Sequence, residues 1–173
     1  MIALGHTGSG ALVGLAAVST LTEVPAPLPL ALAIVLLSGI AAHYIGDWLP
    51  HGHYRFNSKK MNKSEVIKLG IDFLLPVFLI LILAINKFEV GWESAVILTA
   101  ISGVHLPDIF ENLIDLKILP NTAAAKEHRR FHYDRLHWHN DPTMSILPNG
   151  ARPLMLVDIY QLALLVLAIY LLA

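Results

Sequence analysis

The sequence contains no cysteine, few charged residues and no excess of basic over acidic side chains. Without cysteine the chain can form no disulfide and offers no thiolate to a metal ion, so histidine nitrogen and carboxylate oxygen are the side-chain ligands that remain. The formal net charge of −1 argues against a nucleic-acid binder, because neutralising phosphates requires an excess of Lys and Arg. We therefore expect no nucleic-acid partner.

Two common catalytic patterns are also absent. The outer glycines of GHTGSG (residues 5–10) have the spacing of a phosphate-binding loop, but apolar residues stand where the Lys and Ser/Thr should follow. No serine lies in a recognisable nucleophile elbow. Gly10 and Gly14 instead form a pair of small residues four apart, which predicts that another helix approaches this segment closely.

The residues that are abundant are apolar. The chain of 173 residues is 55% hydrophobic and only 14% charged, which is too apolar for a soluble domain of this size. Five apolar segments each come near the ~20 residues that span a bilayer; they cover residues 3–21, 28–47, 66–85, 92–110 and 153–172. We predict an all-α integral membrane protein, in which residues 1–173 form a single bundle of about five transmembrane helices, with a cytoplasmic helical loop at 111–152 between the fourth and fifth helices.

The order of these segments gathers ionisable side chains at one end of the bundle. If the chain crosses back and forth, the starts of the first, third and fifth spans and the ends of the second and fourth share one side. The ionisable residues of the spans all fall toward this side: His6, His43, Asp47, Asp72, His105, Asp108 and Asp158. A charge inside a membrane costs about 2.5–3.5 kcal/mol, so such residues tend to face the bundle interior and bind or pair there. Their convergence predicts one shared site.

The basic residues indicate which compartment this side faces. Of the 12 Lys and Arg residues, only Lys87 lies in a loop on the opposite side. Because cytoplasmic loops carry the excess of Lys and Arg, the site and the N-terminus should face the cytoplasm. We predict a multi-pass protein of the inner (cytoplasmic) membrane, with most of its basic side chains near anionic membrane lipid.

The stretch AHYIGDWLPHGHYR (residues 42–55) carries the densest set of candidate ligands. On a continuing helix His43 and Asp47 are four residues apart and project from one face, so that both can reach a single ion. His51 follows in the same stretch. An interfacial belt of aromatic and histidine side chains is the alternative interpretation.

Carboxylates also occur near the start of the third segment and near the end of the fourth, which share one side of the predicted bundle. His105 and Asp108 are three residues apart, and a second His–Asp pair at the same depth favours a site over packing. Asp72 lies about one turn from Lys68 and can either join the site or pair with that lysine.

The loop between the fourth and fifth segments is also rich in histidine. Thr122 or Asn121 can cap a helix that continues to about residue 140, on which His128, His132 and His139 form one stripe. This helix can fold as a lid that brings ligands to the carboxylates, or it can lie on the membrane surface with its histidines in water.

Four short motifs resemble those of the YdjM-like membrane-bound metal-dependent hydrolases. They are HTGS at His6–Ser9, HYIGDWLPH at His43–His51, LPDI at Leu106–Ile109 and HRRFH at His128–His132. The resemblance implies a small inner-membrane protein with hydrolase activity.

We expect a site for one or two divalent ions. Zn²⁺ is preferred, and Mn²⁺ or Fe²⁺ also suit mixed nitrogen and oxygen ligands. The candidate ligands are His6, His43, Asp47, His51, His105, Asp108, His128 and His132. Asp47 or Asp72, when not bound to metal, would act as general base, and Arg129 can orient a phosphate.

These features favour hydrolysis of an amphiphilic phosphoester or lipid-like small molecule. Two alternatives are a membrane protein that handles metal ions or protons, and a noncatalytic adaptor. A transporter would normally need polar groups in both halves of the membrane, whereas here the opposite half is almost purely apolar. An adaptor would leave the intramembrane carboxylates without a purpose.

Overall fold

The computed structural model describes residues 3–48, 63–115, 117–132 and 154–173, and every regular element in these ranges is a helix. The all-α prediction is confirmed. Five helices correspond to the predicted apolar segments, and one short helix lies in the predicted loop. They are α1 (Ala3–Glu23), α2 (Leu28–Trp48), α3 (Lys63–Phe88), α4 (Trp92–Asp115), α5 (Ala123–Arg129) and α6 (Leu154–Leu172).

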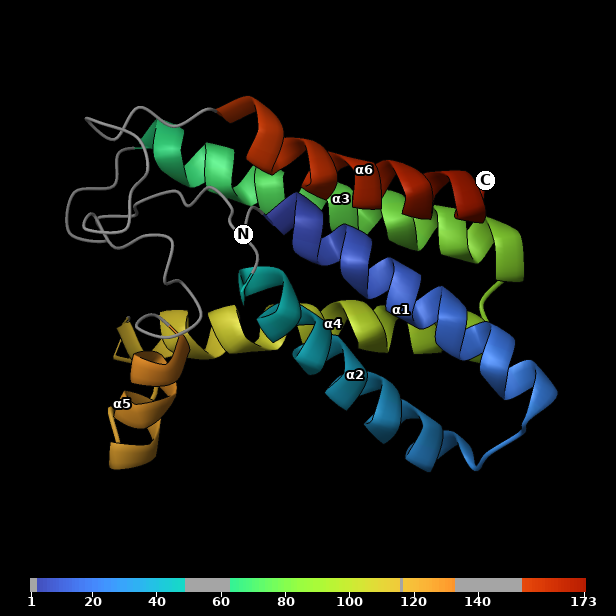
Figure 1. Ribbon diagram of the computed structural model, residues 1–173, viewed down its shortest axis with the longest axis horizontal. Coiled ribbons are helices and arrows are strands. Elements are labelled where there is room, and N and C mark those ends of the chain that lie inside the picture. Colours follow the sequence, from blue (N-terminus) through green and yellow to red (C-terminus); the bar gives the residue numbers. More distant parts are fainter. Residues whose placement is uncertain (1–2, 49–62, 116, 133–153) are drawn as a thin grey trace.

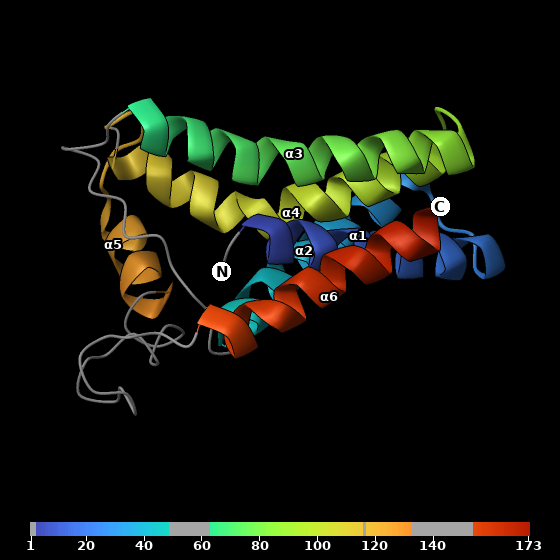
Figure 2. The same ribbon diagram turned by 90° about the horizontal axis from the view of Figure 1, so that it is seen from above.

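The long helices run alternately in two directions. In Figure 1, α1, α3 and α6 run one way and α2 and α4 run the other, so the starts of the first three and the ends of the other two lie toward the same end. Helix α5 lies at that end too, as Figure 2 shows from above. Helix α4 packs against α1, α2 and α3, and α1 also contacts α6. This is the arrangement that threading the segments back and forth predicts.

The helices extend further than the apolar segments that predict them. Helix α3 begins at Lys63 instead of residue 66, and α4 ends at Asp115 instead of residue 110. Hydropathy marks only the part of a helix that suits an apolar environment, whereas backbone hydrogen bonds continue into polar flanks. The predicted loop is shorter as a result, because its first residues belong to α4.

Glycines bring α1, α2 and α4 unusually close together. A Cβ atom on Gly14 would lie 2.7 Å from the Cα of Ile97, and one on Gly39 would lie 2.5 Å from the carbonyl oxygen of Ala100. Neither position accepts a side chain without moving backbone. The close approach predicted from the small residues of the first segment is therefore confirmed, and α4 is the helix that approaches.

Apolar residues lie both inside and outside the bundle. Small and branched side chains fill the interior between helices, while many large ones point outward, among them Ile34, Leu37, Leu75, Phe78, Ile82 and Val166. Within the described ranges, α2 is the one helix whose length and composition suffice to cross a membrane; Leu74–Phe88 and Ile159–Leu172 are shorter apolar stretches.

The short helix α5 starts where the sequence predicts. The Thr122 side chain accepts a hydrogen bond from the Ala125 backbone N–H at 3.2 Å and caps the helix. After α5 the chain continues in a wider helical turn over residues 130–132, and His132 is the last residue of this described range. The later part of the predicted loop helix, with His139, lies outside the described residues.

Candidate metal centre

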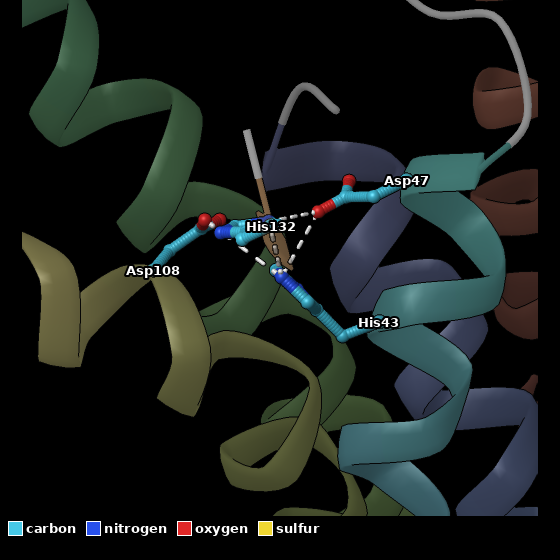
Figure 3. Close-up of side chains that lie close together, drawn as sticks. All are labelled: His43, Asp47, Asp108 and His132. Carbon is cyan, nitrogen blue, oxygen red and sulfur yellow. Dashed lines mark hydrogen bonds and ion pairs between the residues drawn. The ribbon is translucent and has the colours of Figure 1, made fainter. Parts of the chain in front are cut away.

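Two helices and the turn after α5 bring four potential ligands together. His43 and Asp47 lie one turn apart on α2, Asp108 comes from α4, and His132 follows α5. One donor atom from each residue lies within 4.8 Å of all the others. Figure 3 shows the four side chains pointing toward one another. The group can therefore hold a metal ion, and all four residues are among the candidate ligands that the sequence predicts.

The His43 ring is fixed by the backbone of α4. Its Nδ1 lies 2.7 Å from the Val104 carbonyl oxygen, and because a carbonyl only accepts, Nδ1 must carry the hydrogen. In the neutral ring Nε2 is then the nitrogen with a free lone pair, and it lies 3.0 Å from Asp47 Oδ2. Metal-binding histidines usually donate a hydrogen bond from the nitrogen that does not face the metal, as Nδ1 does here.

His132 is held by a carboxylate in the same manner. Its Nδ1 donates to Glu111 Oε1 at 2.7 Å, and its Nε2 lies 2.6 Å from Asp47 Oδ2. The same Nε2 is 3.2 Å from the Nε2 of His43. Two nitrogen lone pairs cannot face each other at this distance beside a carboxylate, so either a proton or a metal ion must lie between these atoms.

The proton is the competing occupant. Burial lowers the pKa of His132, but its hydrogen bonds to Asp47 and Glu111 raise it more, to about 9. In the ion-free chain His132 is accordingly protonated at neutral pH and donates to Asp47. A metal ion that binds the four residues has to displace this proton.

The spacing of the donor atoms suits a small divalent ion. At a zinc–nitrogen distance of about 2.1 Å, neighbouring ligands of a tetrahedral site are about 3.4 Å apart. The pairs His132–Asp47, His43–Asp47 and His43–Asp108 are 2.6, 3.0 and 3.8 Å apart, values that bracket this distance. Two imidazole nitrogens and two carboxylate oxygens also match the donors expected without cysteine.

One edge of the donor group is open. The side chains of His43, Asp47 and His132 are at most 1% exposed, whereas that of Asp108 is 42% exposed. A closed structural site would bury all four ligands, whereas a catalytic site keeps a position for water or substrate. The Asp108 edge is where such a molecule can approach.

His6 of α1 lies directly against the group. Its ring stacks on that of His43 with centroids 4.3 Å apart, and its Nε2 lies 3.4 Å from Asp47 Oδ1 and 3.7 Å from Asp108 Oδ2. His105 lies further from the group, where its Nε2 is 3.0 Å from Thr7 Oγ1. The structure thus brings His6 to the carboxylates and places His105 beside Thr7.

His128 occupies the side of the group that α5 covers. Its Nε2 is 2.7 Å from the Tyr44 hydroxyl oxygen, and its Nδ1 is 3.3 Å from Glu111 Oε1. Burial lowers the pKa of His128, so the ring is neutral at pH 7. Arg129 is the half-buried last residue of α5, and it is not among the four clustered donors.

Two candidate site residues lie beyond what the structure describes. His51 falls between α2 and α3, outside the described residues. Asp72 belongs to α3, but its side chain is outside the described part, so the choice between a site and an ion pair with Lys68 stays open.

Two residues that the sequence analysis did not assign to the site take part in its support. Glu111 is buried and holds His132, and Tyr44 holds His128. Glu111 follows Asp108 by three residues, which is the spacing that puts two side chains on one helical face. That spacing is the signal that could have identified it, but the predicted fourth span ends one residue earlier.

Comparisons of the chain with protein-family models, with curated proteins and with solved structures give no match in any of the three. The resemblance to the YdjM-like hydrolases therefore stays a prediction.

Proposed function

We propose that this chain is a multi-pass protein of the inner membrane that hydrolyses an amphiphilic phosphoester at a metal centre on its cytoplasmic side. The observation that carries the proposal is the donor group of His43, Asp47, Asp108 and His132, in which three side chains are buried and that of Asp108 is 42% exposed. In this group the Nε2 atoms of His43 and His132 face each other, and the Nδ1 of each ring donates to an oxygen. An ion pair that serves only stability does not require this arrangement.

The distribution of apolar side chains supports the membrane part of the proposal. Large apolar residues cover the outward faces of α2, α3 and α6, while histidines and carboxylates lie inside. A soluble protein seldom exposes apolar surface on this scale, whereas in a bilayer such faces contact lipid and small residues form the helix contacts. The excess of basic residues on the side of the donor group supports its cytoplasmic orientation.

The chemistry follows from the donors and from the residues beside them. A divalent ion held here supplies Lewis acidity and makes water a better nucleophile near neutral pH. The neutral His128 ring can accept a proton, and its hydrogen bond with the Tyr44 hydroxyl positions it. Arg129 can pair with a phosphate in two parallel hydrogen bonds. Asp47, which lies between three imidazoles, serves as a ligand in this proposal and not as the base.

The substrate class follows from the location of the open edge. A donor group at the end of a lipid-embedded bundle is accessible to a molecule whose polar head lies at the membrane surface. Carboxylate and imidazole ligands, together with Arg129 at the end of α5, suit a phosphoester head group. The resemblance to membrane-bound metal-dependent hydrolases points to the same class.

The test uses full-length protein in lipid nanodiscs. Short-chain phosphatidic acid and a phosphodiester lipid are supplied as substrates, and release of phosphate or alcohol is measured before chelation, after chelation and after addition of Zn²⁺, Mn²⁺ or Fe²⁺. We expect hydrolysis that chelation removes and one of these ions restores, and no hydrolysis by His43→Ala. Hydrolysis that persists in metal-free protein would refute the proposal. Ion flux across proteoliposomes without hydrolysis would favour the transporter alternative.

A further inference from the structure

Both aspartates of the donor group offer two oxygens to different imidazoles. Asp47 turns Oδ2 toward His43 and His132, and Oδ1 toward His6 at 3.4 Å. Asp108 turns Oδ1 toward His43 at 3.8 Å and Oδ2 toward His6 at 3.7 Å. The carboxylates thus face two neighbouring positions: one lined by His43 and His132, and a second lined by His6.

Neither ring nitrogen of His6 makes a hydrogen bond of good geometry among the described residues, although the side chain is only 1% exposed; Nε2 lies within ion-pair distance of both carboxylates. Leaving a buried polar atom without a partner costs about 1–3 kcal/mol. The ring stacks on His43 with only 17° between the ring planes, and each Nε2 faces an oxygen of the same two carboxylates. A packing role alone would not require one nitrogen to face two carboxylate oxygens at 3.4 and 3.7 Å.

We propose that a second divalent cation binds between His6 Nε2, Asp47 Oδ1 and Asp108 Oδ2, with both carboxylates bridging it to the first ion. This inference rests on the proposed metal centre and extends it to a pair of ions. In two-metal hydrolytic sites the ions lie about 3.5–4 Å apart and stabilise the attacking and leaving oxygens of a phosphoryl centre. Such a pair is compatible with the phosphate esters of the proposed function.

The second position should hold its ion more weakly than the first. It has one imidazole and two carboxylate oxygens, and it includes the exposed Asp108, which leaves room for water and a substrate oxygen. Oxygen-rich donors favour Mn²⁺ and Mg²⁺ more than an imidazole-rich position does. A protonated His6 paired with Asp47 is the alternative that the experiment has to exclude.

The experiment counts ions and measures their coupling in the full-length protein. After equilibrium dialysis against Mn²⁺, bound metal is determined by mass spectrometry, and the electron paramagnetic resonance spectrum is recorded. We expect two ions per chain and a spectrum of exchange-coupled Mn²⁺ for the parent. His6→Phe keeps a flat ring for stacking but offers no ligand, so it should bind one ion and give an uncoupled six-line spectrum. His105→Phe is the matched control and should retain two coupled ions.

The outcomes separate this inference from the proposed function. One uncoupled ion in the parent, or two ions in His6→Phe, would overturn the second site and leave the first intact. No bound ion in the parent would overturn both. Because the coupled spectrum is measured on the parent chain, the inference can be tested even if a variant fails to fold.

Discussion

The two ends of the α1–α2–α4 contact are built in opposite ways. Toward the α1–α2 connection, Gly14 and Gly39 press against the backbone of α4 at Ile97 and Ala100. At the other end, imidazoles and carboxylates from the same helices meet. Gly39 lies one turn before His43 on α2. We infer that the glycine contacts set the distance between α1, α2 and α4. This distance in turn decides whether the donors at the polar end can share an ion.

The largest effect is expected when the central carboxylate of the polar end loses its charge. Asp47→Asn keeps the size of the side chain but removes the anion that faces His6, His43 and His132. Metal affinity should fall more than the 10–100-fold that loss of a supporting residue causes, and turnover should fall with it. Metal content and hydrolysis are measured on the same preparation.

The matched control is the same type of change at an exposed position. Glu127→Gln also converts an acid to an amide, on a side chain that is 71% exposed and is not among the four clustered donors, and it should leave metal content unchanged. If Asp47→Asn retains its metal and full activity, Asp47 is not a ligand and the polar end has to be explained without an ion.

Replacing His128 should separate proton transfer from metal binding. His128→Gln removes the neutral ring beside Glu111 and Tyr44 but none of the four clustered donors. Turnover should fall by about 10²–10⁴-fold, the usual contribution of a positioned proton acceptor, while metal content stays at the parental level. Tyr44→Phe, which removes only the partner hydroxyl, should have a smaller effect. Loss of metal in His128→Gln would instead make His128 a ligand.

A smaller effect is expected at the carboxylate that holds His132. Glu111→Gln weakens the hydrogen bond to Nδ1 and leaves the ring free to rotate. Outer partners of this kind typically contribute 10–100-fold in metal affinity, so the dissociation constant, measured by competition with a chelating dye, should rise within that range. An unchanged constant would show that packing alone orients His132.

The sequence sufficed to predict the helices and the end at which the polar groups meet. Apolar length indicates the five long helices, and their alternating direction predicts that seven ionisable residues of the spans converge. Contacts of 3.0–3.8 Å join four of them: His6, His43, Asp47 and Asp108. His105 lies beside Thr7, and the side chains of Asp72 and Asp158 lie outside the described part. The prediction succeeded for these residues because the direction of successive antiparallel helices follows from their order alone.

The rest depends on tertiary packing that sequence spacing does not encode. The rotation of α4 about its own axis turns Asp108 and Glu111 toward the donors and places His105 beside Thr7 instead. The wider turn after α5 decides that His132, and not His128, enters the four-residue group. The predicted loop includes Glu111 because the fourth apolar segment ends at residue 110. Helix α4, however, continues to Asp115.

The smallest effect on the site is expected from the apolar end. Gly39→Ala places a Cβ where the Ala100 carbonyl oxygen already lies 2.5 Å away, and such overpacking costs about 1–3 kcal/mol in the free energy of unfolding. Gly70→Ala is the control, because a Cβ there meets nothing within 4 Å, and it should raise stability by about 0.5–1 kcal/mol through helix propensity. Thermal unfolding in detergent compares the two. Equal effects would show that α2 and α4 do not depend on this contact.

The most direct test of the central claim is a calorimetric titration of Zn²⁺ into metal-stripped protein in two buffers of different ionisation enthalpy. Because the pKa of His132 is raised to about 9, the ion-free chain carries this proton at pH 7 and must release it on binding. We predict saturable binding with at least one proton released per chain, and an affinity that rises by about tenfold per pH unit from pH 6 to 8. The absence of saturable binding, or binding with no proton released, would contradict it and leave the His132 proton as the occupant of the site.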